Sequence, residues 1–314
     1  MTTEISVITC SHNPRPDYLE RVFDALRKQT LDKWRWEFLL IDNSSRDPLE
    51  ARIDLSWHPN ARHIGEGKLG LTHARLKGIR EATGDLLVFV DDDNVLDDDY
   101  LEEALRVAEE WPRLGAWGGQ TRPGFEETPP DWTRPYWSRL VIREFNSDRW
   151  SNQPSSADSM PCGAGMCVRK SVADYYAFLH ANGHRKILMD RAGDSLLSGG
   201  DSDLAICACD KDLGMGLFTS LKLTHLIPSS RLTEDYLVRL LEALACSAIV
   251  LDSFRSSATG APNGKSSGQK LSGSIADVGR LLLRNRRERR FFRAVKSGEE
   301  KAIKLLNGKQ PKDH

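Results

Sequence analysis

Apolar and polar positions follow two different periods along the first 120 residues. Short apolar runs at residues 5–10, 36–41, 61–64, 86–90 and 114–119 predict strands. Apolar residues at helical spacing predict helices over residues 18–29, 71–82 and 99–110. Strands that alternate with helices in this way are typical of parallel βαβ units. We therefore expect an α/β fold.

The run at residues 86–90 ends abruptly in Asp91-Asp92-Asp93-Asn94. In an open α/β sheet, ligands bind beyond the carboxyl ends of the strands. Adjacent carboxylates repel one another unless a cation or a proton relieves them, and oxygen ligands of this kind suit Mg²⁺ or Mn²⁺. Alternation along an extended chain predicts Asp91 and Asp93 on one side and Asp92 on the other. A solvated acidic loop is the alternative interpretation.

The pattern changes after residue 120. Residues 120–160 are irregular and rich in proline and tryptophan, a second α/β stretch covers residues 160–228, and an apolar helix follows at 234–254. Residues 256–274 are rich in serine and glycine, and residues 280–296 are strongly basic. We expect two halves of one domain at 1–120 and 121–254, which the family resemblance described below would make the donor-binding and acceptor-binding halves of a catalytic domain, a flexible linker at 255–274 and a basic helical extension at 275–314.

Composition excludes several classes of protein. The chain has 314 residues and a net charge of −1, so its overall charge does not favour binding to nucleic acid. The six cysteines form no C-x-x-C pair, no signal peptide precedes the first strand, and no apolar run reaches the length of a membrane span. We therefore expect a cytoplasmic protein with reduced thiols. The usual dinucleotide and P-loop signatures are missing.

Several motifs together resemble the family 2 glycosyltransferases of GT-A fold. The resemblance spans roughly residues 4–250, and each motif alone is weak, but their order and spacing are specific. The motifs are Thr9-Cys10-Ser11-His12-Asn13, Leu40-Ile41-Asp42-Asn43-Ser44-Ser45, Gly70-Leu71-Thr72-His73-Ala74-Arg75, Gly84-Asp85 before Asp91-Asp92-Asp93-Asn94, Cys162-Gly163-Ala164-Gly165-Met166, Gly199-Gly200-Asp201-Ser202-Asp203 and His225-Leu226-Ile227-Pro228.

The resemblance implies a Rossmann-like nucleotide-binding domain with a mixed central sheet, followed by a helical C-terminal extension. It implies an inverting transfer of a sugar from a nucleotide-sugar donor, most simply a UDP-sugar, with Mn²⁺ or Mg²⁺ as cofactor. The acceptor would be a hydroxyl of a saccharide or of a lipid-linked molecule, as in polysaccharide biosynthesis.

The resemblance assigns donor binding to the first half of the chain. Asp42 would accept a hydrogen bond from the nucleobase, although an Asx turn is the alternative. Arg75 would bind phosphate or the base edge, the alternative being a surface arginine paired with Glu81 or Asp85. Asp93 would contact the metal, and His225 would be a further ligand. The remaining donor residues would be Thr9, Asn13, Asp91 and Asp92.

Asp201 is our candidate for the catalytic base. An inverting transfer needs one group that takes the proton of the acceptor hydroxyl as that oxygen attacks. Asp201 lies at a predicted loop-to-helix junction, so a simple N-cap is the alternative interpretation. The sequence has Gly200 where the family usually has a glutamate, which weakens the case for acceptor contacts there. Asp203 is the reserve candidate for the base and an acceptor contact.

Each of the remaining candidate acceptor contacts has a structural alternative. Gly165 and Met166 lie in a small-residue turn that allows close approach of a ligand, or simply joins two strands. Trp132 and Trp137 could stack on sugar rings or pack in the core.

The basic C-terminal segment has two interpretations. It could be an amphipathic helix at an anionic membrane surface, which would put the protein at the inner face of the membrane, or a helix docked on the catalytic domain. Two other functions also stay open: a sugar-phosphate nucleotidyltransferase, and a non-catalytic sugar-nucleotide binder suggested by Gly200.

Overall fold

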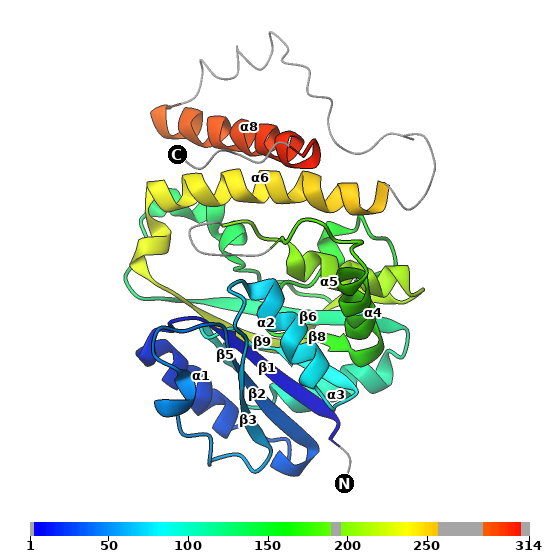
Figure 1. Ribbon diagram of the computed structural model, residues 1–314. Coiled ribbons are helices and arrows are strands. Elements are labelled where there is room, and N and C mark those ends of the chain that lie inside the picture. The colour runs from blue at the N-terminus through cyan, green and yellow to red at the C-terminus, as the bar shows by residue number, and fades with distance from the viewer. Residues whose placement is uncertain (1–2, 190–195, 257–284, 309–314) are drawn as a thin grey trace.

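The computed structural model describes residues 3–189, 196–256 and 285–308. In these residues one mixed sheet has the strand order β3-β2-β1-β4-β8-β6-β9-β5, and a further strand, β7, pairs with β9 (Figure 1). Helices cover both faces of the sheet, and two long helices lie beyond one end of it. The α/β expectation with a mixed central sheet is confirmed.

The first four strands of that order run parallel. They are β3 (Ala61–Gly65), β2 (Trp36–Asp42), β1 (Ile5–Ser11) and β4 (Leu86–Phe89). Helix α1 (Pro16–Arg27) packs on one face of these strands, and α2 (Leu71–Glu81) packs on the other. Alternate strand residues, such as Val7 and Ile8, therefore enter different layers of the core. The carboxyl ends of β1, β2 and β4 meet at one edge.

The second half of the sheet is mixed. Strand β8 (Met166–Arg169) is antiparallel to β4 and to β6 (Leu114–Phe125), while β9 (Gly214–Ile227) runs parallel to β6. The short strands β5 (Asn94–Leu96) and β7 (Arg149–Ser151) are both antiparallel to β9. The apolar pattern did not predict the full length of β6, because this strand continues through polar residues to Phe125, and it did not predict β5, which has only three residues.

Helices α3 (Tyr100–Glu110), α4 (Lys170–Ala181) and α5 (Gly200–Asp210) complete the two layers. Short 3₁₀ segments connect the elements: η1 (Lys33–Arg35), η2 (Leu49–Ala51), η3 (Asp131–Leu140), η4 (Ala157–Ser159) and η5 (Ser229–Leu232). The tryptophan-rich stretch is thus ordered around η3.

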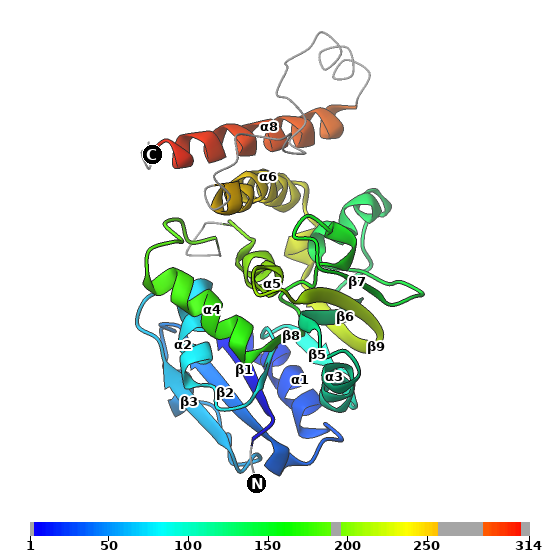
Figure 2. The same cartoon turned by 90° about the vertical axis from the view of Figure 1, so that its right-hand side faces the viewer.

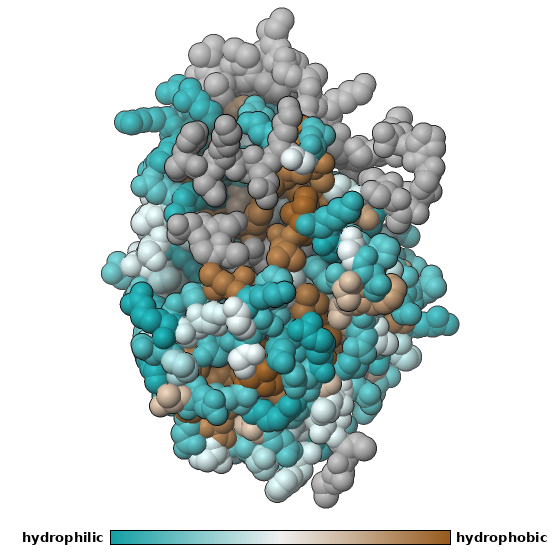
Figure 3. All heavy atoms as spheres, in the orientation of Figure 1, coloured by the Kyte–Doolittle hydropathy of each residue, from teal (hydrophilic) through white to brown (hydrophobic). Residues whose placement is uncertain are grey.

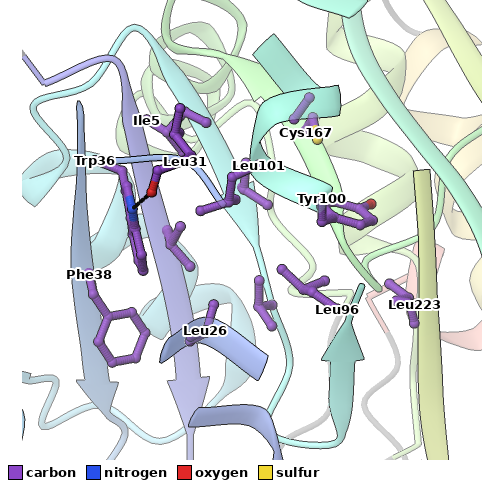
Figure 4. Packing of buried hydrophobic residues seen from close by; sticks show 14 of the residues in the cluster. Ile5, Leu26, Leu31, Trp36, Phe38, Leu96, Tyr100, Leu101, Cys167 and Leu223 are labelled. Carbon is purple, nitrogen blue, oxygen red and sulfur yellow. Dashed lines mark hydrogen bonds between the residues drawn. The ribbon is translucent and has the colours of Figure 1, made fainter. Parts of the chain in front are cut away.

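Large buried side chains hold α1 against the sheet. The rings of Phe23 and Phe38 meet edge to face, with their centres 5.7 Å apart. Trp36 donates its indole N–H to the carbonyl of Leu31 over 3.3 Å (Figure 4). Burying one such side chain contributes about 1.5–3 kcal/mol. This packing fixes β2, and with it the position of Asp42 at its end.

His58 lies in the same layer and makes the stability of the fold depend on pH. The centre of its ring lies 4.0 Å from that of Trp36 with the two rings tilted by 56°, and its Nδ1 accepts the backbone N–H of Asn60. Burial lowers the pKa of His58 from 6.5 to about 4. Between these two pH values His58 is protonated in the unfolded chain but neutral in the folded chain. The free energy of unfolding therefore falls as the pH drops through this window.

We expect the free energy of unfolding to fall by about 2 kcal/mol from about pH 7.5 to about pH 5, before most carboxylates titrate. The variant His58→Asn keeps an acceptor near the position of Nδ1 but does not titrate, so its stability should change much less over the same range. Urea denaturation at several pH values measures both slopes. Equal slopes in the two proteins would contradict this account.

Helices α6 (Glu234–Ser256) and α8 (Arg286–Leu306) pack against each other beyond the sheet (Figure 2). Phe291, Ala294, Gly298 and Ala302 form the buried face of α8. A Cβ atom at Gly298 would lie 2.0 Å from the carbonyl oxygen of Glu242, so a glycine is needed where the helices approach most closely. The docked alternative for the basic segment is thus the one observed, while the predicted linker lies almost entirely outside the described residues.

On the face shown in Figure 3, apolar side chains gather at the height of α6, whereas hydrophilic side chains cover most of the lower half. Of the helices in the described ranges, none combines the length and the apolar character that crossing a membrane requires.

Candidate active site

A cavity of about 230 Å³ lies beyond the carboxyl ends of β1 and β4. Its wall brings together residues that are far apart in the sequence, from the first strand to η5. The predicted site residues that line it are Arg75, Asp91, Asp92, Asp93, Asp201 and His225. A larger cavity of about 320 Å³, beside α1, is lined mainly by apolar side chains and contains none of the predicted site residues.

The three acidic residues after β4 form a turn. The backbone N–H of Asn94 donates to the carbonyl of Asp91 over 3.0 Å, and all three aspartates reach the same cavity. The predicted alternation of Asp92 against its neighbours is therefore wrong, since extended geometry ends with β4. Burial, and then the nearby Asp93 carboxylate, raise the pKa of Asp92 well above its usual range, although a hydrogen bond from Ser11 opposes this.

Asp93 and His225 meet across the cavity. Strand β5 pairs with β9, which sets Asn94 opposite His225 and leaves His225 Nε2 3.4 Å from Asp93 Oδ2. His225 Nδ1 lies 3.0 Å from the carbonyl oxygen of Leu140. Because a carbonyl only accepts, the proton belongs on Nδ1, and the lone pair of the neutral ring lies on Nε2. An imidazole fixed in this way is suited to ligating a metal.

Arg75 and Asp201 approach each other at Gly163. Arg75 is buried on α2 with its Nη2 4.0 Å from Asp91 Oδ1, so the alternative of a surface arginine is wrong. Asp201 Oδ2 accepts the backbone N–H of Gly163 over 2.8 Å, and Oδ1 accepts that of Ser202 over 2.9 Å. A Cβ atom at Gly163 would lie 2.6 Å from Arg75 Nη2 and 3.4 Å from Asp201 Oδ2.

The other predicted donor residues lie near the cavity without lining it. Asp42 accepts the backbone N–H groups of Ser45 and Leu49, both over 2.9 Å. Burial opposes ionisation there, but these hydrogen bonds prevail and lower the pKa of Asp42. Thr9 is fully buried in β1, and Asn13 is an exposed residue with φ of 49° whose side chain accepts the N–H of Arg46.

Asp203 is turned away from the cavity. Two residues along a helix correspond to about 200°, so Asp201 and Asp203 lie on opposite faces of α5. Asp203 is buried and binds Arg185 through two hydrogen bonds of 2.7 and 3.0 Å, and Arg255 through one of 3.1 Å. These contacts anchor the first turn of α5. They leave Asp203 in no position to act in the cavity that Asp201 reaches.

The predicted acceptor residues also lie outside this cavity. Gly165, with φ of 68°, packs against the hydroxyl of Tyr100, and Met166 is fully buried in the core. Trp132 packs on Phe291 beneath the guanidinium of Arg287, and Trp137 packs on Phe125. The irregular sequence around η3 gave no indication that these rings would face α8 and β6.

Several residues of the cavity wall are not predicted by the sequence. Arg231, in η5, places Nη1 3.0 Å from Asp93 Oδ2. Burial lowers the pKa of Arg231, but the attraction of the Asp93 carboxylate outweighs this effect, and the net result is a raised pKa. A lone arginine in a Pro-Ser-Ser-Arg turn has no periodicity to reveal it, although its closeness to His225 in sequence was a usable signal. The other such residues are Cys10, His12, Leu71, Asn94, Val141 and Ser198, whereas Gly163 and Ala164, which also line the cavity, belong to the small-residue turn that the sequence had singled out.

Among the described residues, no group of three or more histidine, cysteine, aspartate or glutamate side chains is arranged to hold a metal ion. The pair Asp93 and His225 supplies two converging donor atoms. Protein sites for Mg²⁺ commonly use one or two carboxylates and take further ligands from substrate phosphates. The donor set therefore fits a divalent ion that is bound together with a diphosphate.

Comparisons with known proteins identify the fold and the family of this chain. The chain is 29% identical over 109 residues, 34% of its length, to "Putative glycosyltransferase EpsH" of Bacillus subtilis (strain 168), and the match spans only 31% of that relative. The structure resembles S. aureus TarS 1-349, with a TM-score of 0.52 at 14% identity over 99% of this chain and 93% of that chain.

The same fold is seen in S. aureus TarS 1-349 in complex with UDP-GlcNAc, with a TM-score of 0.55 at 13% identity over 98% of this chain and 84% of that chain. The family model described as glycosyl transferase family 2 matches residues 6–175, which is more than half of the chain. The expected GT-A-type fold is thus confirmed. The chain belongs to glycosyl transferase family 2.

Proposed function

We propose that this chain transfers a sugar from a UDP-sugar to a hydroxyl of a saccharide or lipid-linked acceptor, with inversion at the anomeric carbon and with help from a divalent metal ion. The carrying observation is the single cavity that holds the acidic turn, Arg75 and Asp201 together. Support for a uridine nucleotide comes from S. aureus TarS, which has the same fold and was solved in complex with UDP-GlcNAc.

In this proposal the sugar-nucleotide donor binds at the carboxyl ends of the parallel strands β1, β2 and β4. Arg75 is buried, so its guanidinium is held in place, and it can bind a phosphate oxygen pair bidentately. Asp91 lies 4.0 Å from that guanidinium, at the edge where a ribose would lie. Asp42 and Asn13 would lie beside the nucleobase beyond Asp91, whereas Thr9 is fully buried in β1 and would not contact it. Both Asp42 oxygens already accept backbone N–H groups, so a base would share one of them.

Asp93 and His225 are the proposed metal ligands. When bound there, Mn²⁺ or Mg²⁺ would neutralise the diphosphate as it leaves. Asp93 and His225 orient one another, and the carbonyl of Leu140 holds the imidazole in the tautomer that puts the lone pair on Nε2.

Asp201 is the proposed base. Backbone N–H groups of Gly163 and Ser202 fix the orientation of its carboxylate at the start of α5. It would take the proton of the acceptor hydroxyl while that oxygen bonds to the anomeric carbon, and the bond from that carbon to the diphosphate oxygen would break on the opposite side. We place the acceptor along Val141 and Ser198, which line the cavity.

Assays with a panel of nucleotide sugars and hydroxyl acceptors test this function. The expected result is metal-dependent release of UDP together with a glycoside of inverted configuration, read by proton NMR. Retained configuration would contradict an inverting mechanism. Binding of UDP and Mn²⁺ without sugar release from any donor would indicate a binder, and release of pyrophosphate from a nucleoside triphosphate and a sugar phosphate would indicate a nucleotidyltransferase.

We also propose that the outer face of α8 contacts an anionic membrane surface. Arg287 and Arg290 pair with Glu234 on α6. By contrast, Arg286, Arg289 and Arg293, at helical spacing on another side of α8, have no ion-pair partner in the part of the chain that the structure describes. An anionic surface would supply the missing counter-charges, and it would suit a lipid-linked acceptor.

Replacing Arg286, Arg289 and Arg293 together by glutamine should weaken binding to phosphatidylglycerol-containing vesicles roughly 100-fold, at about 1 kcal/mol for each basic residue. Co-sedimentation at low salt measures this. The control replaces the exposed residues Arg21, Arg52 and Arg113 by glutamine, which removes the same charge elsewhere. Equal losses in both triple variants, or no vesicle binding by the unmodified protein, would refute the contact.

A further inference from the structure

The guanidinium of Arg231 lies between the two proposed metal ligands. Its Nη1 is 3.0 Å from Asp93 Oδ2 and 3.1 Å from His225 Nε2, and these two acceptor atoms are 3.4 Å apart. One nitrogen thus contacts both atoms that a divalent ion would need. A guanidinium cannot lose its charge under ordinary conditions, so it competes with any other cation for this pair.

The charges around the cavity explain why a cation is needed there. Asp91, Asp92 and Asp93 lie within one turn and line the same cavity, so their carboxylates repel one another unless a cation lies near them. Arg75 lies 4.0 Å from Asp91, and Arg231 lies 3.0 Å from Asp93. Removing Arg231 would take a positive charge away from beside a buried carboxylate, which is costly.

The location of Arg231 allows its side chain to move. It belongs to η5, a segment of four residues after Pro228, and not to the sheet. Its side chain keeps 22% of its surface exposed and lines the cavity. Rotation about its side-chain bonds would carry the guanidinium toward the cavity without any change in β9, which carries His225.

We propose that Arg231 is an internal counter-cation that exchanges with the metal ion. In the free protein its guanidinium binds the two atoms of Asp93 and His225 that would ligate the metal ion. On donor binding the guanidinium moves to the diphosphate, because it binds phosphate oxygens well. The inference rests on the proposed function, because it takes Asp93 and His225 as the ligands. It has a thermodynamic consequence: a divalent ion alone binds weakly, and the ion and the nucleotide strengthen each other's binding.

A permanently structural ion pair would behave differently. If Arg231 only neutralised Asp93, the guanidinium would stay in place and the bound ion would use other atoms. Substituting Arg231 would then lower stability without improving the affinity for the ion. The two accounts therefore predict opposite changes in one equilibrium constant.

The test measures Mn²⁺ binding without nucleotide, by the loss of the free-ion EPR signal. In Arg231→Met, which keeps much of the apolar length but no charge, we expect Mn²⁺ to bind about tenfold more tightly than in the unmodified protein, because its competitor is gone. Calorimetric titration with UDP, with and without Mn²⁺, should show that the factor by which Mn²⁺ raises the affinity for UDP falls by about the same amount. The nucleotide no longer has to draw the arginine away from the metal ligands.

Two further variants keep the test decisive. Arg122→Met is the matched control: Arg122 pairs with Asp97, outside the cavity, so the same change in net charge should leave Mn²⁺ affinity unaltered. Arg231→Lys serves should Arg231→Met not fold. Its compact ammonium on a shorter side chain bridges Asp93 and His225 less well, and Mn²⁺ should bind several-fold more tightly than in the unmodified protein.

Unchanged or weaker Mn²⁺ binding in the folded Arg231 variants would overturn the inference. So would an equal gain in Arg122→Met, since the effect would then be one of net charge alone. Failure of the proposed function looks different: the unmodified protein would release no sugar from any donor. The inference can thus fail while transfer is intact, because the EPR measurement needs no turnover.

Discussion

Replacing Asp201 by asparagine should reduce sugar transfer by about 10²–10⁴-fold and leave the affinity for the UDP-sugar within a few-fold, the usual scale for loss of a general base. Asparagine keeps the shape of the side chain and can still accept the N–H of Gly163, so the donor site should persist. Steady-state kinetics and calorimetric titration of UDP measure the two effects separately. A loss confined to KM would mean that Asp201 binds substrate and does not act as a base.

The matched control is Asp203→Asn, two residues further along the same helix turn. Because Asp203 compensates Arg185 and Arg255 in a buried place, this change should lower the free energy of unfolding by about 3–5 kcal/mol. The protein that remains folded should keep most of its turnover. Normal turnover in Asp201→Asn together with lost turnover in folded Asp203→Asn would reverse the two roles.

Replacing Asp93 by alanine should abolish the increase in UDP affinity that Mn²⁺ produces. The carboxylate is a proposed ligand, and the diphosphate would lose the cation that neutralises it. Calorimetric titration of UDP with and without Mn²⁺ measures this increment. Binding without metal should persist in part, because Arg75 remains in place.

Asp97→Ala is a suitable control for this experiment, since Asp97 follows the same turn but pairs with Arg122 outside the cavity. The variant Asp93→Asn tests whether charge or shape matters, and it should behave like the alanine variant. A metal-dependent increment that survives in both Asp93 variants would remove Asp93 from the metal site.

The sequence predicted the layers of the fold because these depend on local periodicity. The strands β1, β2 and β4 are buried on both faces and read as continuous apolar runs, while α1 and α2 show apolar residues at helical spacing, so the apolar pattern reports both kinds of element directly. Strand β5 could not be predicted in this way. Its three residues pair with β9 from more than a hundred positions away, and its sequence, Asn94-Val95-Leu96, carries no distinctive pattern.

The site was predictable where a residue follows a strand or begins a helix. Asp91, Asp93 and Asp201 met that condition, and the structure brings them into one cavity with Arg75, which lies in the second turn of α2. The failures have a common physical cause. Asp92 was misplaced because a turn replaces the strand, and Arg231 was missed because only tertiary packing of η5 brings it to Asp93.

Gly163 has a consequence for mutational screens. Even a methyl group there would meet Arg75 Nη2 at 2.6 Å and contact Asp201 at 3.4 Å, so an alanine must displace a donor-binding arginine, a proposed base or both. A residue with no side chain and no chemistry of its own should therefore tolerate replacement as poorly as the acidic residues do. In a library of random variants selected for activity, position 163 should retain only glycine, while the protein expressed from rejected variants should remain folded.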